Sequence, residues 1–332
     1  MKTKKAYQKE IFSNRLIKQQ RILSKWAGKN GIYCYRLYDK DIPEIPLLID
    51  AYHSIDHEPY LIVSLYKRPY KVDENEEIAY LKEFAMLSAS LLQVPSSNVA
   101  IKIREKKRGT SQYNKTENTD GLCFISKEGE ALFYINISDY IDAGLFLDHR
   151  PLRLLLGKEA KNKNVLNLFC YTASFSIHAI LGGARSVCSV DTSKSALLWA
   201  EKNLMLNNIK SSNNFCLVNK EAMAFLDEMV AKRKTWNLII CDPPTFSNSK
   251  SRKDFFDVNK DYVTLCCKCL KVLEKGGTLY FSSNSRQLKF DEKLLKDSNN
   301  EKLFIKDISK ATIPFDFRNK NIHKTWKIVK EN

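Results

Sequence analysis

Residues 164–191 constrain the fold of this chain more than any other stretch; they read NVLNLFCYTASFSIHAILGGARSVCSVD. A short apolar run is followed by small hydroxyl-bearing residues at 171–174, a helical apolar pattern that ends at Gly182-Gly183, and a β-rich run that stops at Asp191. This order predicts strand, tight turn, helix and strand, with a carboxylate at the end of the second strand. Both strand ends of such a unit lie on the ligand-binding edge of a doubly wound sheet. We therefore expect Asp191 to accept hydrogen bonds from a ribose diol.

The turn lacks the glycine pattern G-x-G-x-x-G that presses a pyrophosphate against a helix N-terminus. A turn of small residues without a phosphate cradle suits S-adenosylmethionine, which has adenine and ribose but no phosphate. The alternative is an ordinary βαβ unit with an acidic strand end, and this stretch alone does not decide between them.

Downstream of Asp191, strands and helices alternate, which predicts a parallel α/β sheet. A helix is expected at 193–207, with Ser193 as its N-cap. Its expected core-facing residues are Leu197, Leu198, Ala200, Leu204 and Met205. The remaining expected elements are strands at 215–218, 236–241, 278–282 and near 325–329, and helices at 222–232 and 259–273. A sheet of about seven strands with a late antiparallel strand is the class I methyltransferase architecture, a Rossmann-like fold.

The first part of the chain predicts a smaller α+β domain. Its expected elements are helices at 11–26 and 76–92, strands within 33–66 and at 99–104, and a hairpin of 122–125 with 131–137. We therefore expect a basic N-terminal helix at 1–30, an RNA-binding or accessory domain at 31–138, and the methyltransferase domain at 139–332.

The formal net charge of +16 indicates a polyanionic partner. Residues 1–30 carry nine basic side chains against Glu10, and residues 101–115 carry six against Glu105. Neither cluster has a strong apolar face, so an RNA backbone is favoured over a membrane; a solvated charged surface is the alternative.

Cysteine usage and hydropathy agree with a cytoplasmic protein. No apolar run reaches the length of a membrane span, and the N-terminus has no hydrophobic leader core. Several of the nine cysteines lie in apolar contexts typical of reduced thiols. The C-C-x-C group at 266–269 lies on a helical stretch, where its sulfurs cannot converge on one ion, so no metal is expected.

A second motif, DPPTFSNSK at 242–250, follows the apolar strand NLIIC. The two prolines cannot donate to a sheet ladder, so the strand must end here. Asp242 and the carbonyls of Pro243 and Pro244 then present acceptors over the sheet edge, and Phe246 is placed to stack on a planar base.

These motifs together resemble bacterial large-subunit rRNA methyltransferases of the RlmK and RlmI type. The resemblance runs through NLFCYT at 167–172, Asp191, the DPPTFSNSK motif, GLFLDHR at 144–150 and Arg318-Asn319. It is closer to RlmK, the guanine-N7 half of the fused RlmK/L enzyme of 23S rRNA. The guanine-N2 half of that enzyme is not part of this sequence, so a separate guanine-N2 methyltransferase is an expected partner besides 23S rRNA. The chain itself is expected to be a monomer or a homodimer.

The resemblance implies roles at matching positions. The implied cofactor-binding residues are Phe146, Asp148, Arg150, Asn167, Phe169, Tyr171, Thr172, Ser174, Asp191, Glu221 and Asp242. The implied RNA-binding residues are Lys106, Lys107, Arg108, Gln112, Tyr113 and Lys250. His149 and His323 are placed near the site only by this resemblance. The sequence departs from the family at Ala173, where the family has Gly, and at Glu221, where it has Asp; an alanine in a left-handed turn costs about 1 kcal/mol.

The chemistry separates the branches of this family. Guanine N7 has a free lone pair, so its methylation needs no general base and no covalent intermediate. Cytosine C5 methylation needs a thiolate that first adds to C6. In RlmI-like enzymes that cysteine falls where this chain has Asn284. The predicted catalytic residues are therefore Asp242, Pro243, Pro244, Phe246 and Asn284. The alternatives are cytosine C5 or adenine N6 methylation, or an RNA-binding assembly factor with a degenerate cofactor pocket.

Overall fold

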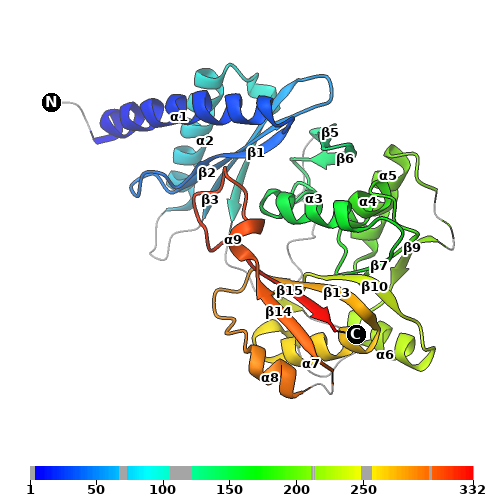
Figure 1. The fold of residues 1–332 in the computed structure, drawn as a ribbon. Coiled ribbons are helices and arrows are strands. Elements are labelled where there is room, and N and C mark those ends of the chain that lie inside the picture. Colours follow the sequence, from blue (N-terminus) through cyan, green and yellow to red (C-terminus); the bar gives the residue numbers. More distant parts are fainter. Residues whose placement is uncertain are drawn as a thin grey trace. The chain divides into compact units, whose positions relative to one another are not determined.

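The computed structural model describes residues 4–66, 73–104, 121–210, 212, 214–247, 256–298 and 301–331. The chain divides into two compact units. The first comprises Met1–Leu147 and Phe315–Asn319, and the second comprises Asp148–Pro314 and Lys320–Asn332. Figure 1 shows the elements of both in ribbon form.

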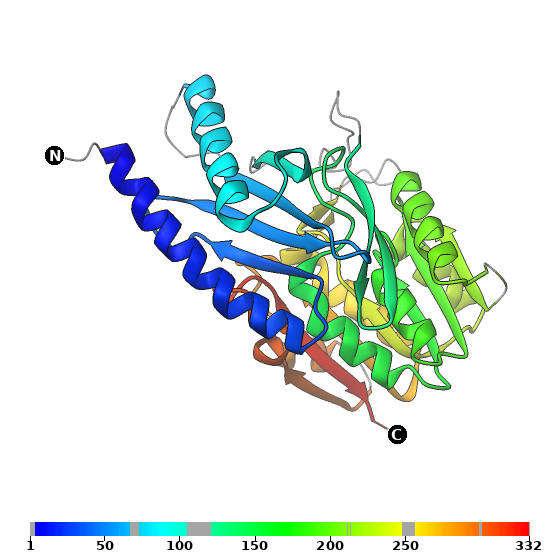
Figure 2. The same cartoon turned by 90° about the horizontal axis from the view of Figure 1, so that it is seen from above.

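The first unit is built on a four-stranded sheet with two helices packed against it (Figure 2). The order is β1 (Cys34–Asp39), β2 (Leu47–His53), β3 (Pro59–Tyr66) and β4 (Val99–Arg104), and only the β3–β4 pair is parallel. The helices are α1 (Lys4–Lys29) and α2 (Glu74–Leu92), and a short 3₁₀ turn, η1 (Ser96–Asn98), precedes β4. Asp73 caps α2 by accepting from the amides of Asn75 and Glu76.

Both helices bury their apolar stripes on the same core. Phe12 of α1 packs edge-on against Tyr38 of β1 and Phe84 of α2, with ring centroids 5.3 and 5.1 Å apart. Leu16, Leu23 and Ala27 continue the stripe. Leu16 and Leu23 belong to the apolar pattern that predicted this helix, which extends further toward the N-terminus than residues 11–26.

A hairpin and a late segment complete the first unit. The hairpin pairs β5 (Cys123–Glu128) with β6 (Ala131–Asn136), and its turn lies at Gly129-Glu130. The segment Phe315–Asn319 belongs to this unit although it comes late in the chain. Asp316 accepts from the Arg36 amide at 2.8 Å, and the Arg318 guanidinium donates to the Asp41 carbonyl at 2.8 Å.

The second unit contains a seven-stranded sheet in the order β14-β15-β13-β10-β7-β8-β9. The strands are β7 (Asn164–Leu168), β8 (Ser186–Asp191), β9 (Phe215–Asn219), β10 (Trp236–Cys241), β13 (Leu273–Ser283), β14 (Leu303–Asp307) and β15 (Lys324–Lys330). Strands β7–β10 and β13 are parallel, and β15 runs antiparallel to β13 and β14. The predicted class I methyltransferase architecture is therefore confirmed, with β14 as a strand that the sequence pattern did not reveal.

Helices cover both faces of this sheet, as Figure 1 shows. One face carries α3 (Arg150–Glu159), α4 (Ser174–Leu181) and α5 (Lys194–Leu206). The other carries α6 (Ala222–Ala231), α7 (Val258–Lys271) and α8 (Glu292–Asp297). The short elements are η3 (Leu147–His149), α9 (Ser309–Thr312), β11 (Phe246–Ser247) and β12 (Phe256–Asp257).

The predicted inner face of α5 is partly wrong. Ser193 caps the helix by accepting from the Ala196 amide, as expected. Leu198 and Met205, however, are 62% and 65% exposed, whereas Trp199 and Asn203 are buried. Leu198 and Met205 are seven residues apart and share the outward face, which hydrophobicity alone did not reveal.

Within the described residues, no helix has the length and apolar character needed to cross a bilayer.

Candidate functional site

The candidate site lies at the carboxyl edge of the second unit's sheet, where β10, β7 and β8 are neighbours. The chain runs from β7 outward through β8 and β9 and then returns to β10 on the other side of β7. Ligands of doubly wound sheets bind at this reversal of strand order. The segments that follow the three strands are the turn at 169–173, Asp191, and the motif that begins at Asp242.

The turn after β7 holds three non-glycine residues in the left-handed region. Phe169, Tyr171 and Ala173 have φ values of 57°, 50° and 61°. Such conformations cost free energy and persist where surrounding contacts enforce them, often at ligand sites. Here the Cys170 amide donates to the Val190 carbonyl at 3.0 Å, and the Ala173 amide donates to the Cys170 carbonyl at 2.8 Å. Ala173 therefore has the left-handed conformation that was expected to be unfavourable for an alanine, and Phe169 and Tyr171 have it too.

Asp191 links this turn to the end of β8. Its Oδ2 accepts from the Tyr171 amide at 2.9 Å, and its Oδ1 accepts from the Ser193 amide at 2.8 Å. Burial raises the pKa of Asp191, although these backbone amides oppose the shift. A carboxylate has about four acceptor positions, so Asp191 retains capacity for ribose hydroxyls. The carboxylate is half-buried, and the turn lacks the glycine pattern that binds a pyrophosphate; both features fit the ribose end of S-adenosylmethionine.

Asp242 follows β10 and is held from two sides. Ser282, near the end of β13, donates its hydroxyl to Oδ1, and Nε2 of His149 lies 3.3 Å from Oδ2. Pro243 is buried and Pro244 is half-buried. Phe246 follows in β11, pairs with Asp257 of β12, and is 37% exposed. The motif thus presents the carboxylate of Asp242 and the partly exposed ring of Phe246 close together in the sequence.

Asn284 follows β13 and lies beside the same motif. Its Oδ1 accepts from the Thr245 hydroxyl at 2.8 Å. Because the carbonyl oxygen is used in this way, the amide nitrogen retains two N–H donors. Asn284 therefore can donate to an acceptor on a ligand.

A cluster of two histidines and an aspartate lies beside Asp242. His323, immediately before β15, places Nδ1 3.0 Å from Oδ2 of Asp148. Its ring stacks on His149, with centroids 4.4 Å apart and planes at 8°. Burial would raise the pKa of Asp148, but His149 and the His323 hydrogen bond hold it well below its usual range. Asp148 is therefore an anion at neutral pH.

The same cluster has the residue types of a metal site, but its imidazole nitrogens are not oriented to bind one ion. Asp148, His149 and His323 offer ligand atoms within 4.8 Å of one another. An ion bound by two imidazoles lies in the plane of each ring, on its nitrogen lone pair. The planes here are stacked and nearly parallel, so their lone pairs do not converge. The cluster is a hydrogen-bonding network.

Other residues implied by the resemblance are placed differently. Asn167 is 1% exposed, and its side-chain amide donates to the Ser176 hydroxyl of α4. This amide therefore makes a hydrogen bond within the protein core. Glu221 follows β9 at the sheet edge, where it caps α6 by accepting from the Ala224 amide at 2.8 Å. Arg150, Thr172 and Ser174 are buried. Phe146 is exposed and belongs to the first unit. The implied RNA-binding residues Lys106, Lys107, Arg108, Gln112, Tyr113 and Lys250 lie outside the described residues.

Sequence reasoning missed Ser282 and had no independent reason to select His149 or His323. Asp148 and His323 are 175 positions apart and meet only through the order of the strands. Ser282 is the penultimate residue of a buried strand and resembles any small core residue in the sequence. The one available signal was that several polar residues end neighbouring parallel strands.

Comparison with known proteins agrees with this geometry. The sequence model of the S-adenosylmethionine-dependent methyltransferase family matches residues 57–327. Ribosomal RNA large subunit methyltransferase K/L of Psychromonas ingrahamii is 42% identical over 328 residues, which are 98% of this chain and 42% of that protein. The chain thus spans about two fifths of the length of the curated relatives it matches.

Solved structures share the fold at low sequence identity. A SAM-dependent methyltransferase from Streptococcus mutans has a TM-score of 0.70 at 20% identity, over 96% of this chain and 81% of that one. SMU.776, described as a methyltransferase and solved as a complex with SAH, has a TM-score of 0.69 at 22% identity over 95% and 81%. These likenesses support the fold, and the family match covers most of the sequence. The chain therefore belongs to the S-adenosylmethionine-dependent methyltransferase family, and S-adenosylmethionine is its cofactor.

Proposed function

We propose that this protein methylates a base of large-subunit (23S) ribosomal RNA, at guanine N7, by direct transfer without a covalent intermediate. The relatives that match almost all of this chain are named large subunit rRNA methyltransferases K/L. Their names support the RNA substrate, and the chemistry at the end of β13 supports the position on the base.

Asn284 is the observation that carries the assignment to N7. By the resemblance to RlmI-like enzymes, Asn284 stands where their cysteine for C5 methylation falls, and its carbonyl oxygen accepts from the Thr245 hydroxyl. A guanine presents the acceptors O6 and N7 on one edge. The free N–H donors of Asn284 suit O6, which would bring N7 toward the methyl donor.

The described thiols near this edge are poorly suited to nucleophilic catalysis. Cys170 and Cys241 are buried, and burial raises the pKa of both well above the ordinary value. A thiol that stays protonated cannot add to C6 of a cytosine. Transfer to a ring nitrogen with a free lone pair needs no such group.

Each site residue then has a distinct task. S-adenosylmethionine supplies a methyl group on a positively charged sulfur. Asp191 binds the ribose hydroxyls, Phe246 stacks on the extruded base, and Asp242 accepts from the N1 or N2 edge of the guanine. Pro243 and Pro244 end β10 and fix the direction of the chain at that point. Catalysis on this scheme is mainly positioning.

The test is to identify the methylated atom. Purified protein, labelled cofactor and 23S rRNA transcripts should give RNA that breaks at one guanosine after borohydride reduction and aniline, because N7 methylation makes that ring labile. Cys241→Ser protein that remains folded should stay active. Cys269→Ser, which alters another buried thiol on α7, is its matched control for the stability cost of a buried hydroxyl.

A methyl group on cytosine C5 or adenine N6, or a covalent RNA–cysteine adduct, would contradict this proposal. A calorimetric titration addresses the non-enzymatic alternative, an assembly factor with a degenerate pocket. Absence of S-adenosylmethionine binding would favour that alternative.

The first unit is proposed to hold RNA, because α1 carries much of the positive charge.

A further inference from the structure

The carboxylate of Asp242 is contacted by protein groups at both of its oxygens. Its side chain is 24% exposed, so it is open to a ligand. Ser282 donates to one oxygen, and His149 faces the other from 3.3 Å. Rotation of this carboxylate about its terminal bond would break the Ser282 hydrogen bond and move the other oxygen away from His149. This restricts the directions of its remaining lone pairs.

His149 is itself immobilised on several sides. It lies at the junction of η3 and α3 and is 5% exposed. Its ring stacks on His323 at 4.4 Å and meets the ring of Phe175 edge-on at 5.7 Å. His323 is fixed in turn by Asp148 at 3.0 Å and by the Thr312 hydroxyl at 3.2 Å. The imidazole therefore has one accessible orientation.

The protonation of His149 follows from its surroundings. Burial lowers the pKa of His149, and His323 and Arg153 add to this, although Asp242 and Asp148 oppose it. Whether neutral or charged, a ring that faces a carboxylate carries a proton on Nε2, since two lone pairs would otherwise meet. Its buried Nδ1 has no hydrogen-bond partner among the described residues. An unsatisfied buried atom costs free energy and calls for a compensating reason.

We propose that His149 is a positioning residue: its Nε2–H, together with the Ser282 hydroxyl, fixes the Asp242 carboxylate in the orientation that receives the substrate base. This inference rests on the proposed function, because it assumes that Asp242 contacts the base. His149 transfers no proton and does not touch the base. The stack on His323 supplies the rigidity that makes the orientation unique.

A double-mutant cycle tests this inference. His149→Leu fills a similar volume without a donor, and His149→Gln returns an N–H near the Nε2 position. Both are made in wild-type protein and in Asp242→Ala protein, and Ser282→Ala serves as an independent removal of the second donor. Single-turnover methyl transfer to 23S rRNA, KM for the RNA and calorimetric affinity for S-adenosylmethionine are measured for each, with thermal melts to verify folding.

We expect His149→Leu to lower the transfer rate by about tenfold to a hundredfold, with cofactor affinity changed by less than about twofold. His149→Gln should recover most of that rate. In Asp242→Ala protein, His149→Leu should cause no further loss, because the residue acts only through that carboxylate. Ser282→Ala should lower the rate in the same way, and it keeps the test valid if the His149 variants do not fold.

Additive losses in the Asp242→Ala background would overturn the inference. A fall in cofactor affinity that accounts for the whole loss of rate would also overturn it, since His149 would then act through Asp148. These outcomes differ from a failure of the proposed function, in which wild-type protein itself would transfer no methyl group to the RNA.

Discussion

At the scale of single residues, Asp191 combines a proposed role in cofactor binding with a structural role that the sequence did not predict. Its position at the end of β8 predicts the ribose contact. The structure adds that its carboxylate accepts the amides of Tyr171 and Ser193, and thereby holds a turn with three left-handed residues. If Asp191 holds the ribose as proposed, binding and folding depend on the same side chain.

We expect Asp191→Ala to lower both cofactor affinity and stability. Loss of charge-assisted bonds worth about 1.5–3 kcal/mol should weaken S-adenosylmethionine binding by roughly ten- to hundredfold. The melting temperature should fall as well, because two backbone amides lose their acceptor. Calorimetric titration and thermal melts measure the two effects.

Asp307→Ala is the matched control for this variant. Asp307 is exposed and accepts from the Ser309 amide at 2.8 Å, so its loss removes a similar local bond at the end of β14, five strands from β8 in the sheet order. It should reduce stability and leave affinity unchanged. Unchanged affinity in Asp191→Ala protein would refute the placement of the cofactor.

At the scale of helices and strands, the sequence predicted those elements whose position follows from a local pattern of apolar and turn residues. The strands β7, β8 and β10 were found because apolar runs end at turn residues or prolines. The phase of α5 was partly wrong, because Leu198 and Met205 are apolar but exposed. β14 was missed because its alternating residues, LFIKD, form a short edge strand without a strong apolar run. The Asp148–His323 contact was beyond local reasoning, because it depends on which strands pair.

The pairing of β8 with β9 produces a thiol pair whose chemistry is specific to the fold. Cys188 and Cys216 are register partners and both are half-buried. The hydrogen bond from Cys188 lowers the pKa of Cys216 to about 7, with burial opposing and Lys234 assisting the shift. The pKa of Cys188 is raised in consequence. Cys216 should thus be a thiolate above about pH 7, while Cys188 stays protonated.

We expect iodoacetamide to alkylate Cys216 before Cys188, at a rate that rises with pH through a midpoint near 7. Peptide mass mapping over a pH series measures this order. In Cys188→Ala protein the midpoint should move upward, because the thiolate loses its donor. Earlier labelling of Cys188, or an unchanged midpoint in the variant, would contradict the paired arrangement.

At the scale of the whole molecule, the net charge of +16 is informative only through its distribution. The structure divides the basic residues of α1 that follow Lys4 into two groups. Lys5 and Lys9 pair with Glu83, and Arg15 pairs with Asp41, so these side chains stabilise the first unit. A second group, the α1 basic stripe, comprises Lys18, Arg21, Lys25 and Lys29, which are all exposed.

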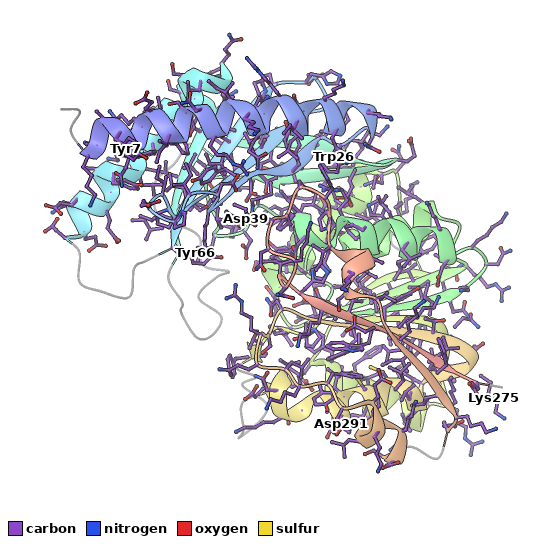
Figure 3. The ribbon with its side chains drawn as sticks, turned by 60° about the vertical axis from the view of Figure 1, so that its left-hand side comes forward. Tyr7, Trp26, Asp39, Tyr66, Lys275 and Asp291 are labelled. Carbon is purple, nitrogen blue, oxygen red and sulfur yellow. The ribbon has the colours of Figure 1, made fainter. Side chains whose placement is uncertain are left out.

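The geometry of α1 favours RNA as the partner of this stripe. Its members recur every three or four residues and so follow one side of the helix. No described acidic side chain forms an ion pair with any of the four. The apolar side of α1 is buried in the unit's own core, which removes the surface that a membrane-binding helix would insert. Tyr7 and Trp26, labelled in Figure 3, mark the two ends of the helix.

We expect the triple variant Lys18→Gln, Arg21→Gln, Lys25→Gln to bind 23S rRNA fragments with a weaker salt dependence. Each lost phosphate contact should reduce the slope of log K against log salt by about 0.7 for a single strand, so roughly two in all. The control is Lys271→Gln, Lys275→Gln, Lys293→Gln, which removes the same charge from exposed positions of the second unit. Equal slopes in the two triples would mean that total charge, rather than the α1 basic stripe, attracts the RNA. A changed slope with unchanged cofactor affinity would assign the stripe to the RNA backbone.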